Sequence, residues 1–227
     1  MKTSLKNLVK GTAILAVALF ISSCKKDDVD DSGSANIKVV NASSGSTAQG
    51  FYLANSTVVA GGLTYGESTD GYITTNSGNN LTAEFRNEGT ATVYAKTNSD
   101  FDKGKSYSVF LAGDGQSARV KVYEDDLSAP ASGQAKVRFI HLSDAAAANV
   151  DIRNAAGTNL AANLAHDSST NFSTVAPGVL SLQVFAAGGS SSLASFDLTA
   201  LASGKIYTVY ITGATAGSVS VKQITHN

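Results

Sequence analysis

Apolar and polar residues alternate with a period of two along most of the chain after residue 36. Inward apolar side chains recur at every second position in two segments, as Tyr107, Val109 and Leu111 and as Tyr207, Val209 and Ile211. Such alternation predicts half-buried β-strands, and clusters of Gly, Asn and Ser separate the strands. The weak helical pattern of residues 143–150 is too short for an independent helix. The predicted class is therefore all-β.

The sequence repeats itself at an interval of 100 residues. ANIKVVNAS begins at Ala35 and AKVRFIHLS at Ala135, while FDKGKSYSVFLAG begins at Phe101 and LASGKIYTVYITG at Leu201. Because both pairs keep the same offset, we interpret residues 37–124 and 135–227 as two homologous β-sandwich domains. Residues 125–134 are rich in small and turn residues, which is typical of a linker between domains.

Each predicted domain has a glycine three residues before the tyrosine that opens a strand, Gly104 before Tyr107 and Gly204 before Tyr207. This spacing resembles the tyrosine corner of immunoglobulin-like and fibronectin-like sandwiches, in which the hydroxyl bonds to a backbone group just upstream. A glycine turn before a strand is common in β-proteins. Its occurrence twice in register favours two tandem immunoglobulin-like or fibronectin-like β-sandwich domains.

Residues 1–23 have the pattern of a secretory signal peptide, with lysines followed by an apolar run over residues 11–21. This run is too short to cross a bilayer, which needs roughly 20 apolar residues. The sequence Ile21-Ser22-Ser23-Cys24 resembles the lipobox of bacterial lipoproteins, in which the cysteine takes a diacylglycerol and the chain is cut before it. Cys24 is the only cysteine, and lipidation would remove a thiol that is reactive in an oxidising compartment. An ordinary signal peptide beside a stray cysteine is the alternative.

The residues after the cysteine are charged, Lys25, Lys26, Asp27 and Asp28. They resemble the export signal of surface lipoproteins of the Bacteroidetes, and a solvated tether is the alternative. Because residues 24–36 show no apolar periodicity, we expect the lipidated cysteine and a flexible acidic tether there. The expected localisation is the outer membrane, facing the periplasm or the cell surface, with the membrane contacted through the lipid anchor.

Charge and composition narrow the range of partners. Only 15% of the residues are charged, against about a quarter in typical proteins. Without the three lysines of the signal peptide, 14 of the 17 basic residues remain against 18 acidic residues, so the formal charge is near −4. This balance excludes the basic surface that binds nucleic acid. No cofactor is expected.

Two clusters contain the residue types of a hydrolase, His141 with Ser143 and Asp144, and His166 with Asp167 and Ser168. Neighbours on a strand point to opposite faces, however, and the G-x-S-x-G elbow that presents a nucleophile is missing. His141 shares a strand face with Val137 and Phe139, and Asn41 holds the matching place in the first domain. We therefore predict no catalytic residue, and a hydrogen-bonded structural role for His141.

The sequence contains few residues that could form a metal or ligand site. The three histidines and one cysteine lack zinc-site spacing, so no metal site is predicted. The acidic run 124–126 at the domain junction could collect calcium, but it lacks the loop spacing of a calcium motif and is better interpreted as solvated linker. Phe110 and Tyr210 hold equivalent outward positions and are candidate surface contacts for a glycan or protein. Packing between the domains is the alternative.

The second domain resembles a known family. Its segments VRFIHLSDAAAANVDI, VAPGVLSLQV and LASGKIYTVYITG are similar to the domain-of-unknown-function 4397 family of bacterial secreted and lipid-anchored proteins. The resemblance covers residues 135–213, and the first domain is a divergent copy that matches mainly at its two ends, with Asn41 for His141 and Tyr52 for Asp151. It implies a β-sandwich at the cell envelope and no established reaction. We expect a non-catalytic binding, adhesion or scaffolding protein; a secreted hydrolase, or an accessory subunit of a glycan-degrading system, is the alternative.

Overall fold

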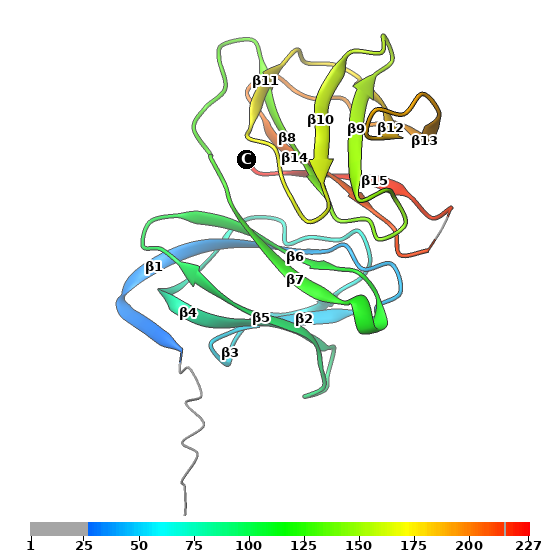
Figure 1. Ribbon diagram of the computed structural model, residues 1–227. Coiled ribbons are helices and arrows are strands. Elements are labelled where there is room, and N and C mark those ends of the chain that lie inside the picture. Colours follow the sequence, from blue (N-terminus) through cyan, green and yellow to red (C-terminus); the bar gives the residue numbers. More distant parts are fainter. Residues whose placement is uncertain (1–26, 216) are drawn as a thin grey trace, which may run out of the picture.

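The computed structural model describes residues 27–215 and 217–227, which form two β-domains packed against each other (Figure 1). Both are built from strands that alternate between a buried and a more exposed face, so the predicted all-β sandwich class is confirmed. In this part of the chain, no helix is long and apolar enough to cross a membrane.

The first domain contains β1 to β7 and one short 3-10 turn at Gly115–Ser117. Its strands are β1 (Asp28–Asn41), β2 (Gln49–Leu53), β3 (Ser56–Leu63), β4 (Ile73–Asn87), β5 (Val93–Phe101), β6 (Ser106–Ala112) and β7 (Arg119–Glu124). Their order is β3-β2-β4-β1-β6-β7, and β5 also pairs with β4. The long strand β4 pairs with β1 through its first half and with β2 and β5 through its second half. It therefore belongs to both layers of the sandwich.

The second domain repeats this plan with the layers separated. Its strands are β8 (Ala135–His141), β9 (Asn149–Asn154), β10 (Asn159–Ala165), β11 (Ser173–Val175), β12 (Ser181–Ala186), β13 (Ser192–Asp197), β14 (Ile206–Thr212) and β15 (Ser220–Thr225). They form two four-stranded sheets, β10-β9-β12-β13 and β11-β8-β14-β15. Val137 pairs with Tyr207 in the parallel β8–β14 ladder, just as Ile37 pairs with Tyr107 in the β1–β6 ladder. The two halves therefore share their register as well as their strand order.

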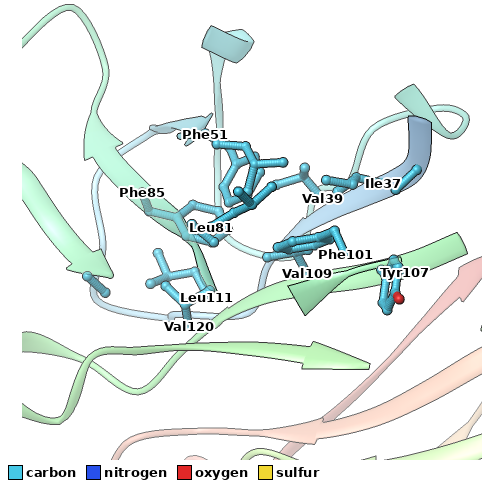
Figure 2. Packing of buried hydrophobic residues seen from close by; sticks show 14 residues of the cluster. Ile37, Val39, Phe51, Leu81, Phe85, Phe101, Tyr107, Val109, Leu111 and Val120 are labelled. Atoms are coloured by element: carbon cyan, nitrogen blue, oxygen red, sulfur yellow. The ribbon is translucent and has the colours of Figure 1, made fainter. Parts of the chain in front are cut away.

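Each domain encloses its own apolar core. Figure 2 shows the core of the first domain, where Phe51 and Phe85 pack with ring centroids 5.1 Å apart. Phe101 meets the edge of the Tyr107 ring at 5.2 Å in the same cluster. The inward-facing side chains of the strands thus form one closed core in each domain, as the alternation of apolar and polar residues predicts.

The two tyrosines close equivalent corners. The Tyr107 hydroxyl accepts a hydrogen bond from the backbone N–H of Asp102 at 3.0 Å, and the Tyr207 hydroxyl accepts one from the N–H of Ala202 at 2.9 Å. The turn before each tyrosine requires its glycine, because φ is +78° at Gly104 and +80° at Gly204. Both hydroxyls therefore bond to the backbone just upstream, which is the geometry of a tyrosine corner.

The flexible tether expected for residues 24–36 is wrong for most of its length. Strand β1 already begins at Asp28, and Asp28, Val29 and Asp30 pair with Asn79, Gly78 and Ser77 of β4. Ahead of the strand, the Asp27 carboxylate accepts hydrogen bonds from the Thr82 backbone N–H at 2.5 Å and hydroxyl at 2.8 Å. Pairing here relies on backbone groups, which leave no apolar periodicity in the sequence. Cys24, Lys25 and Lys26 lie outside the described residues.

A third apolar cluster joins the domains, and it corrects the role expected for Phe110 and Tyr210. It consists of Val40, Ala42, Phe110 and Ala112 from the first domain and Ile140, Leu142, Tyr210 and Ile224 from the second. The rings of Phe110 and Tyr210 are fully buried and meet edge to face at 5.2 Å. They are not surface contacts, because the outward faces of β6 and β14 cover each other. The alternative, packing between the domains, describes them.

The corner bonds predict a modest loss of stability. Replacing Tyr207 by Phe removes the acceptor of the Ala202 N–H and should lower the free energy of unfolding by about 0.5 to 1.5 kcal/mol. Tyr107→Phe should lower the free energy of unfolding by a similar amount. Both losses should stay modest because Asp102 and Ala202 are exposed, so their N–H groups can bond to water instead. Urea unfolding of both variants measures the loss. Two variants as stable as the parent chain would show that the corner bonds contribute nothing.

Candidate functional site

Five polar side chains close a ring of hydrogen bonds in the domain interface. Arg138 Nε donates to the Thr208 hydroxyl at 2.9 Å, and that hydroxyl lies 2.7 Å from His226 Nε2. His226 Nδ1 lies 2.6 Å from the Tyr72 hydroxyl, which donates to Asp125 Oδ2 at 2.6 Å. An Arg138–Asp125 ion pair completes the ring. Tyr72 and Asp125 come from the first domain and the other three residues from the second, so the ring joins the domains.

The hydrogen bonds of the ring are compatible with one placement of the protons on Tyr72, His226 and Thr208. The Tyr72 hydroxyl has a single proton, which goes to the Asp125 carboxylate, so His226 Nδ1 must carry a proton and donate it to Tyr72. His226 Nε2 then accepts from Thr208. Burial lowers the pKa of His226 to about 3, helped by the positive charges of Arg138 and Lys38. The imidazole is therefore neutral and serves as a connector between the domains.

The middle residue of the acidic run 124–126 is not part of a solvated linker, whereas Glu124 and Asp126 are exposed as expected. Asp125 is 7% exposed and also accepts a hydrogen bond from the Ser108 hydroxyl at 2.7 Å. Burial raises the pKa of Asp125, and the Arg138 guanidinium opposes this rise. Glu124 pairs with Lys105 at 2.6 Å and Asp126 with Lys136 at 2.7 Å. Each carboxylate thus has its own cationic partner, which is not the convergent oxygen set that calcium needs.

Three of the hydrolase candidates, Asp144, His166 and Asp167, belong to a second contact between the domains. Arg119 of β7 donates through Nε to both carboxylate oxygens of Asp167 at 2.9 Å, and its Nη1 lies 2.9 Å from Asp144 Oδ1. His166 Nε2 lies 2.9 Å from both Asp144 Oδ1 and Arg119 Nη2. These groups were candidates for a catalytic base and its orienting acid. The structure places them around a guanidinium, where they hold the domains together.

His141 and its counterpart Asn41 each bond to the backbone N–H two residues further on and to one carbonyl, which belongs to a different segment in each domain. His141 Nε2 donates to the Ala147 carbonyl at 2.9 Å and Nδ1 accepts from the Ser143 N–H at 3.3 Å. Asn41 Nδ2 donates to the Leu63 carbonyl at 2.9 Å and Oδ1 accepts from the Ser43 N–H at 3.0 Å. Both side chains are fully buried, and burial lowers the pKa of His141. Each residue therefore satisfies two backbone groups at one end of its sandwich.

An open groove of about 440 Å³ lies along one side of the first domain. It is lined by Val29 and Asp31 of β1, Leu53 of β2, Ala54, Ser56, Thr57 and Val58 of the β2–β3 hairpin, and Ile73, Thr74, Thr75, Asn76 and Leu81 of β4. Leu53 and Leu81 form its floor and belong to the core, with exposed fractions of 4% and 1%. The rim carries hydroxyl and amide groups and one carboxylate, that of Asp31. Ligand pockets combine such an apolar floor with a few polar groups, at volumes of about 300 to 1,000 Å³.

Sequence reasoning missed this groove because its lining residues belong to types that carry no chemical signature. They come from three separate stretches, residues 29–31, 53–58 and 73–81, which meet only in the fold. The sequence contains one indirect indication of the groove. Residues 53–63 and 71–81 contain no charged residue and no proline, which is unusual for strands at the edge of a sheet.

The hydrogen bonds of His141 predict which substitution the second domain tolerates. His141→Asn should retain more stability than His141→Ala, because an Asn can accept the Ser143 N–H as Asn41 accepts that of Ser43 in the first domain. His141→Ala should lower the free energy of unfolding by about 1 to 3 kcal/mol, since it leaves the buried Ser143 N–H and the partly buried Ala147 carbonyl without partners. Thermal unfolding compares the two variants. Equal losses for Asn and Ala would contradict the shared role.

The neutral state of His226 predicts a pH dependence. In the unfolded chain the imidazole titrates near its ordinary pKa of about 6.5, whereas in the fold its pKa is about 3. Between these values the unfolded state binds a proton that the folded state does not bind. The free energy of unfolding should therefore fall as the pH drops from about 6.5 to about 3, by at most about 1.4 kcal/mol per pH unit for this group.

The control for this pH dependence is His226→Gln, which keeps an amide in place of the imidazole. His141 also has a lowered pKa and contributes in the same direction, so the variant should reduce the slope without abolishing it. Urea unfolding at a series of pH values measures both slopes. Parallel curves for the variant and the parent chain would show that His226 is not the titrating group.

Comparisons with known proteins come from three sources. No curated protein matches the chain. Among solved structures, the module CBMbc of family CBM26 from Eubacterium rectale Amy13K, in complex with maltoheptaose, is 12% identical, with 83% of this chain and 95% of that chain covered and a TM-score of 0.27. A protein from Bacteroides uniformis ATCC 8492, provisionally assigned to cell adhesion, is 14% identical, with 86% and 98% covered and a TM-score of 0.23. At these TM-scores neither likeness supports an argument.

The family model described as "Domain of unknown function (DUF4397)" matches residues 35–153, just over half of the chain. The match spans all of the first domain from Ala35 onward, together with β8 and β9. The match therefore covers the first domain throughout, where the resemblance was expected mainly at the two ends. It ends before residue 213, the last residue of the expected resemblance. The chain belongs to the DUF4397 family.

Proposed function

We propose that this chain is a non-catalytic binding protein of the bacterial cell envelope, anchored by a lipid on Cys24. Its two sandwich domains act as one body, and its ligand site is the groove of the first domain. The observation that carries this proposal is the contrast between the groove and the junction. The groove is open and lined by ordinary polar and apolar groups, whereas the charged and imidazole groups of the junction are bonded to one another.

The geometry around the candidate nucleophiles supports a binding role over hydrolysis. The Ser143 hydroxyl donates to the Gly213 carbonyl at 3.1 Å and accepts from the Ala145 and Ala146 N–H groups at 3.2 Å each. His141 Nδ1 is occupied by the Ser143 backbone N–H and does not face the hydroxyl. A nucleophile needs a base within hydrogen-bond reach of its hydroxyl. Neither histidine of the two candidate clusters provides one.

The repeated ladders and corners support two tandem copies of one family domain. The first domain pairs β1 with β6 and the second pairs β8 with β14, both in parallel and with the same offset, and both domains close a tyrosine corner. The buried junction then fixes the two copies in one orientation. A ligand bound to the first domain would therefore be held at a defined position relative to the second.

The place where the fold begins supports a short tether. Strand β1 starts at Asp28 and the Asp27 side chain is bonded to Thr82. Between Cys24 and Asp27 the chain can span at most about 11 Å, since an extended residue covers about 3.3 to 3.6 Å. With Cys24 in the membrane, the first domain would lie against it. The charged residues from Lys25 to Asp28 remain a candidate export signal for the cell surface.

The proposal is tested on the chain without residues 1–23 and with Cys24→Ser, probed on an array of bacterial and host glycans and against solubilised outer-membrane proteins. Chromogenic esterase, glycosidase and peptidase substrates are screened in parallel. We expect a bound partner, lost in Ser56→Trp, which fills the groove, and retained in Thr158→Trp at the equivalent hairpin of the second domain. Binding that survives Ser56→Trp would remove the groove from the proposal.

Turnover of any substrate that disappears in His141→Asn, while stability is retained, would favour the hydrolase alternative. The anchor is tested separately in the full chain. Labelled palmitate should enter the parent protein and be absent from Cys24→Ser. Label retained in that variant would contradict lipidation at Cys24.

A further inference from the structure

The groove of the first domain is flanked by two strand edges that have no neighbour among residues 27–215 and 217–227. Strand β3 ends the sheet order and pairs only with β2. The first residues of β4, Ile73 to Asn76, pair only with β1, and pairing of β4 with β5 and β2 begins at Gly78 and Ala83. Edges of this kind present unpaired backbone N–H and C=O groups to any extended chain that approaches them.

The register of β1 shows which groups of β4 are free. Asn36 N–H donates to the Lys105 carbonyl at 2.9 Å, so residue 36 of β1 turns its backbone groups toward β6. The neighbouring residues of β1 turn theirs toward β4, where Ala35 is opposite Thr75 and Ile37 is opposite Ile73. The alternate residues of β4, Thr74 and Asn76, therefore direct their N–H and C=O groups away from β1. Among the described residues, these outward backbone groups have one partner: the Thr75 hydroxyl makes a long contact of 3.4 Å with the Asn76 carbonyl.

The edge of β4 lacks the usual protection against pairing, whereas β3 carries register shifts against β2 but no charge. Natural edge strands carry charged residues, prolines or bulges that keep other chains away. Residues 56–63 of β3 and 73–77 of β4 contain no charge and no proline. In contrast, β5 at another edge carries Lys96 and Asp100. Between the two edges lie Leu53 and Leu81, which can accept apolar side chains.

We propose that the groove binds an extended peptide segment of another protein by strand addition to Thr74–Asn76. The proposal rests on the binding role proposed above and specifies its ligand. The segment would exchange hydrogen bonds with Thr74 and Asn76 and place aliphatic side chains at alternate positions on Leu53 and Leu81. Its other side chains would face solvent, and the Asp31 carboxylate at the rim favours a neutral or basic segment. In the part of the chain that the structure describes, no aromatic ring lines the groove, which makes it a poor platform for stacking a sugar.

The second domain supplies a matched control. Thr174 of β11 is opposite Lys136, whose N–H donates to the Lys205 carbonyl at 3.0 Å. The N–H of Thr174 is therefore directed away from β8, as that of Thr74 is from β1. Proline at either position removes one outward N–H and leaves the inner ladder in place, and edge strands tolerate this substitution.

The experiment uses phage-displayed random peptides of about nine residues, somewhat longer than a typical strand, selected against the chain without residues 1–23 and with Cys24→Ser. Enriched peptides should alternate aliphatic and polar residues. Their affinity should fall by about tenfold in Thr74→Pro and stay unchanged in Thr174→Pro. Amide hydrogen exchange measured by NMR on the unsubstituted chain gives a readout that needs no folded variant. The bound peptide should protect the N–H groups of Thr74 and Asn76 and leave that of Thr174 exchanging as before.

Several outcomes would overturn the inference. They are the absence of enriched peptides, enrichment without alternation, or binding that leaves the Thr74 and Asn76 amides unprotected. A glycan that binds the groove in the array while no peptide does so would also overturn strand addition. That last result would leave the proposed binding function intact, so the failure of one proposal is distinguishable from the failure of the other.

Discussion

The Arg138–Asp125 ion pair is the constraint on which the arrangement of the two domains depends. Burying two charges costs several kcal/mol per ion unless the remaining donors and acceptors are also satisfied. Here Thr208, His226 and Tyr72 complete the set, and Arg138 Nη1 donates to the Glu124 carbonyl at 2.8 Å. A small rotation of one domain would break several of these bonds at once, at a place where Arg138 and Asp125 are buried. The apolar cluster around Phe110 and Tyr210 supplies attraction between the domains, and the polar ring selects one orientation.

The junction also shows what two diverged copies can do that identical copies cannot. The N–H of Asp125 bonds to the Ser106 carbonyl and that of His226 to the Ile206 carbonyl, so the two residues hold equivalent places after β7 and β15. Lys38 is equivalent to Arg138 and Ser108 to Thr208. The domains meet through the same face, as in a twofold dimer, where identical copies would bring like groups together. With an acid at one place and a neutral imidazole at the other, the ring can close.

The sequence predicted the parts of the fold that alternation and repetition encode. The period of two identifies strands, the offset of 100 residues identifies the domains, and Gly104 with Tyr107 identifies the corner. It could not distinguish a face covered by solvent from one covered by the other domain, so Phe110 was open to both interpretations. The sequence around Asp125 indicates a solvated linker because its partner Arg138 belongs to the next domain. The groove could not be predicted, since its edges are free only because of the strand order.

The groove belongs to the first domain for a reason that lies in its N-terminal strand. Strand β8 begins at Ala135, which is equivalent to Ala35, whereas β1 begins seven residues earlier at Asp28. These added residues pair with β4 and supply Val29 and Asp31 to the wall of the groove. In the second domain the equivalent residues connect the two domains and form no such strand. The segment that reads as a tether therefore builds the wall of the candidate site. With Cys24 lipidated as proposed, the same short stretch would hold the anchor and the ligand site together, so the ligand would be bound next to the membrane.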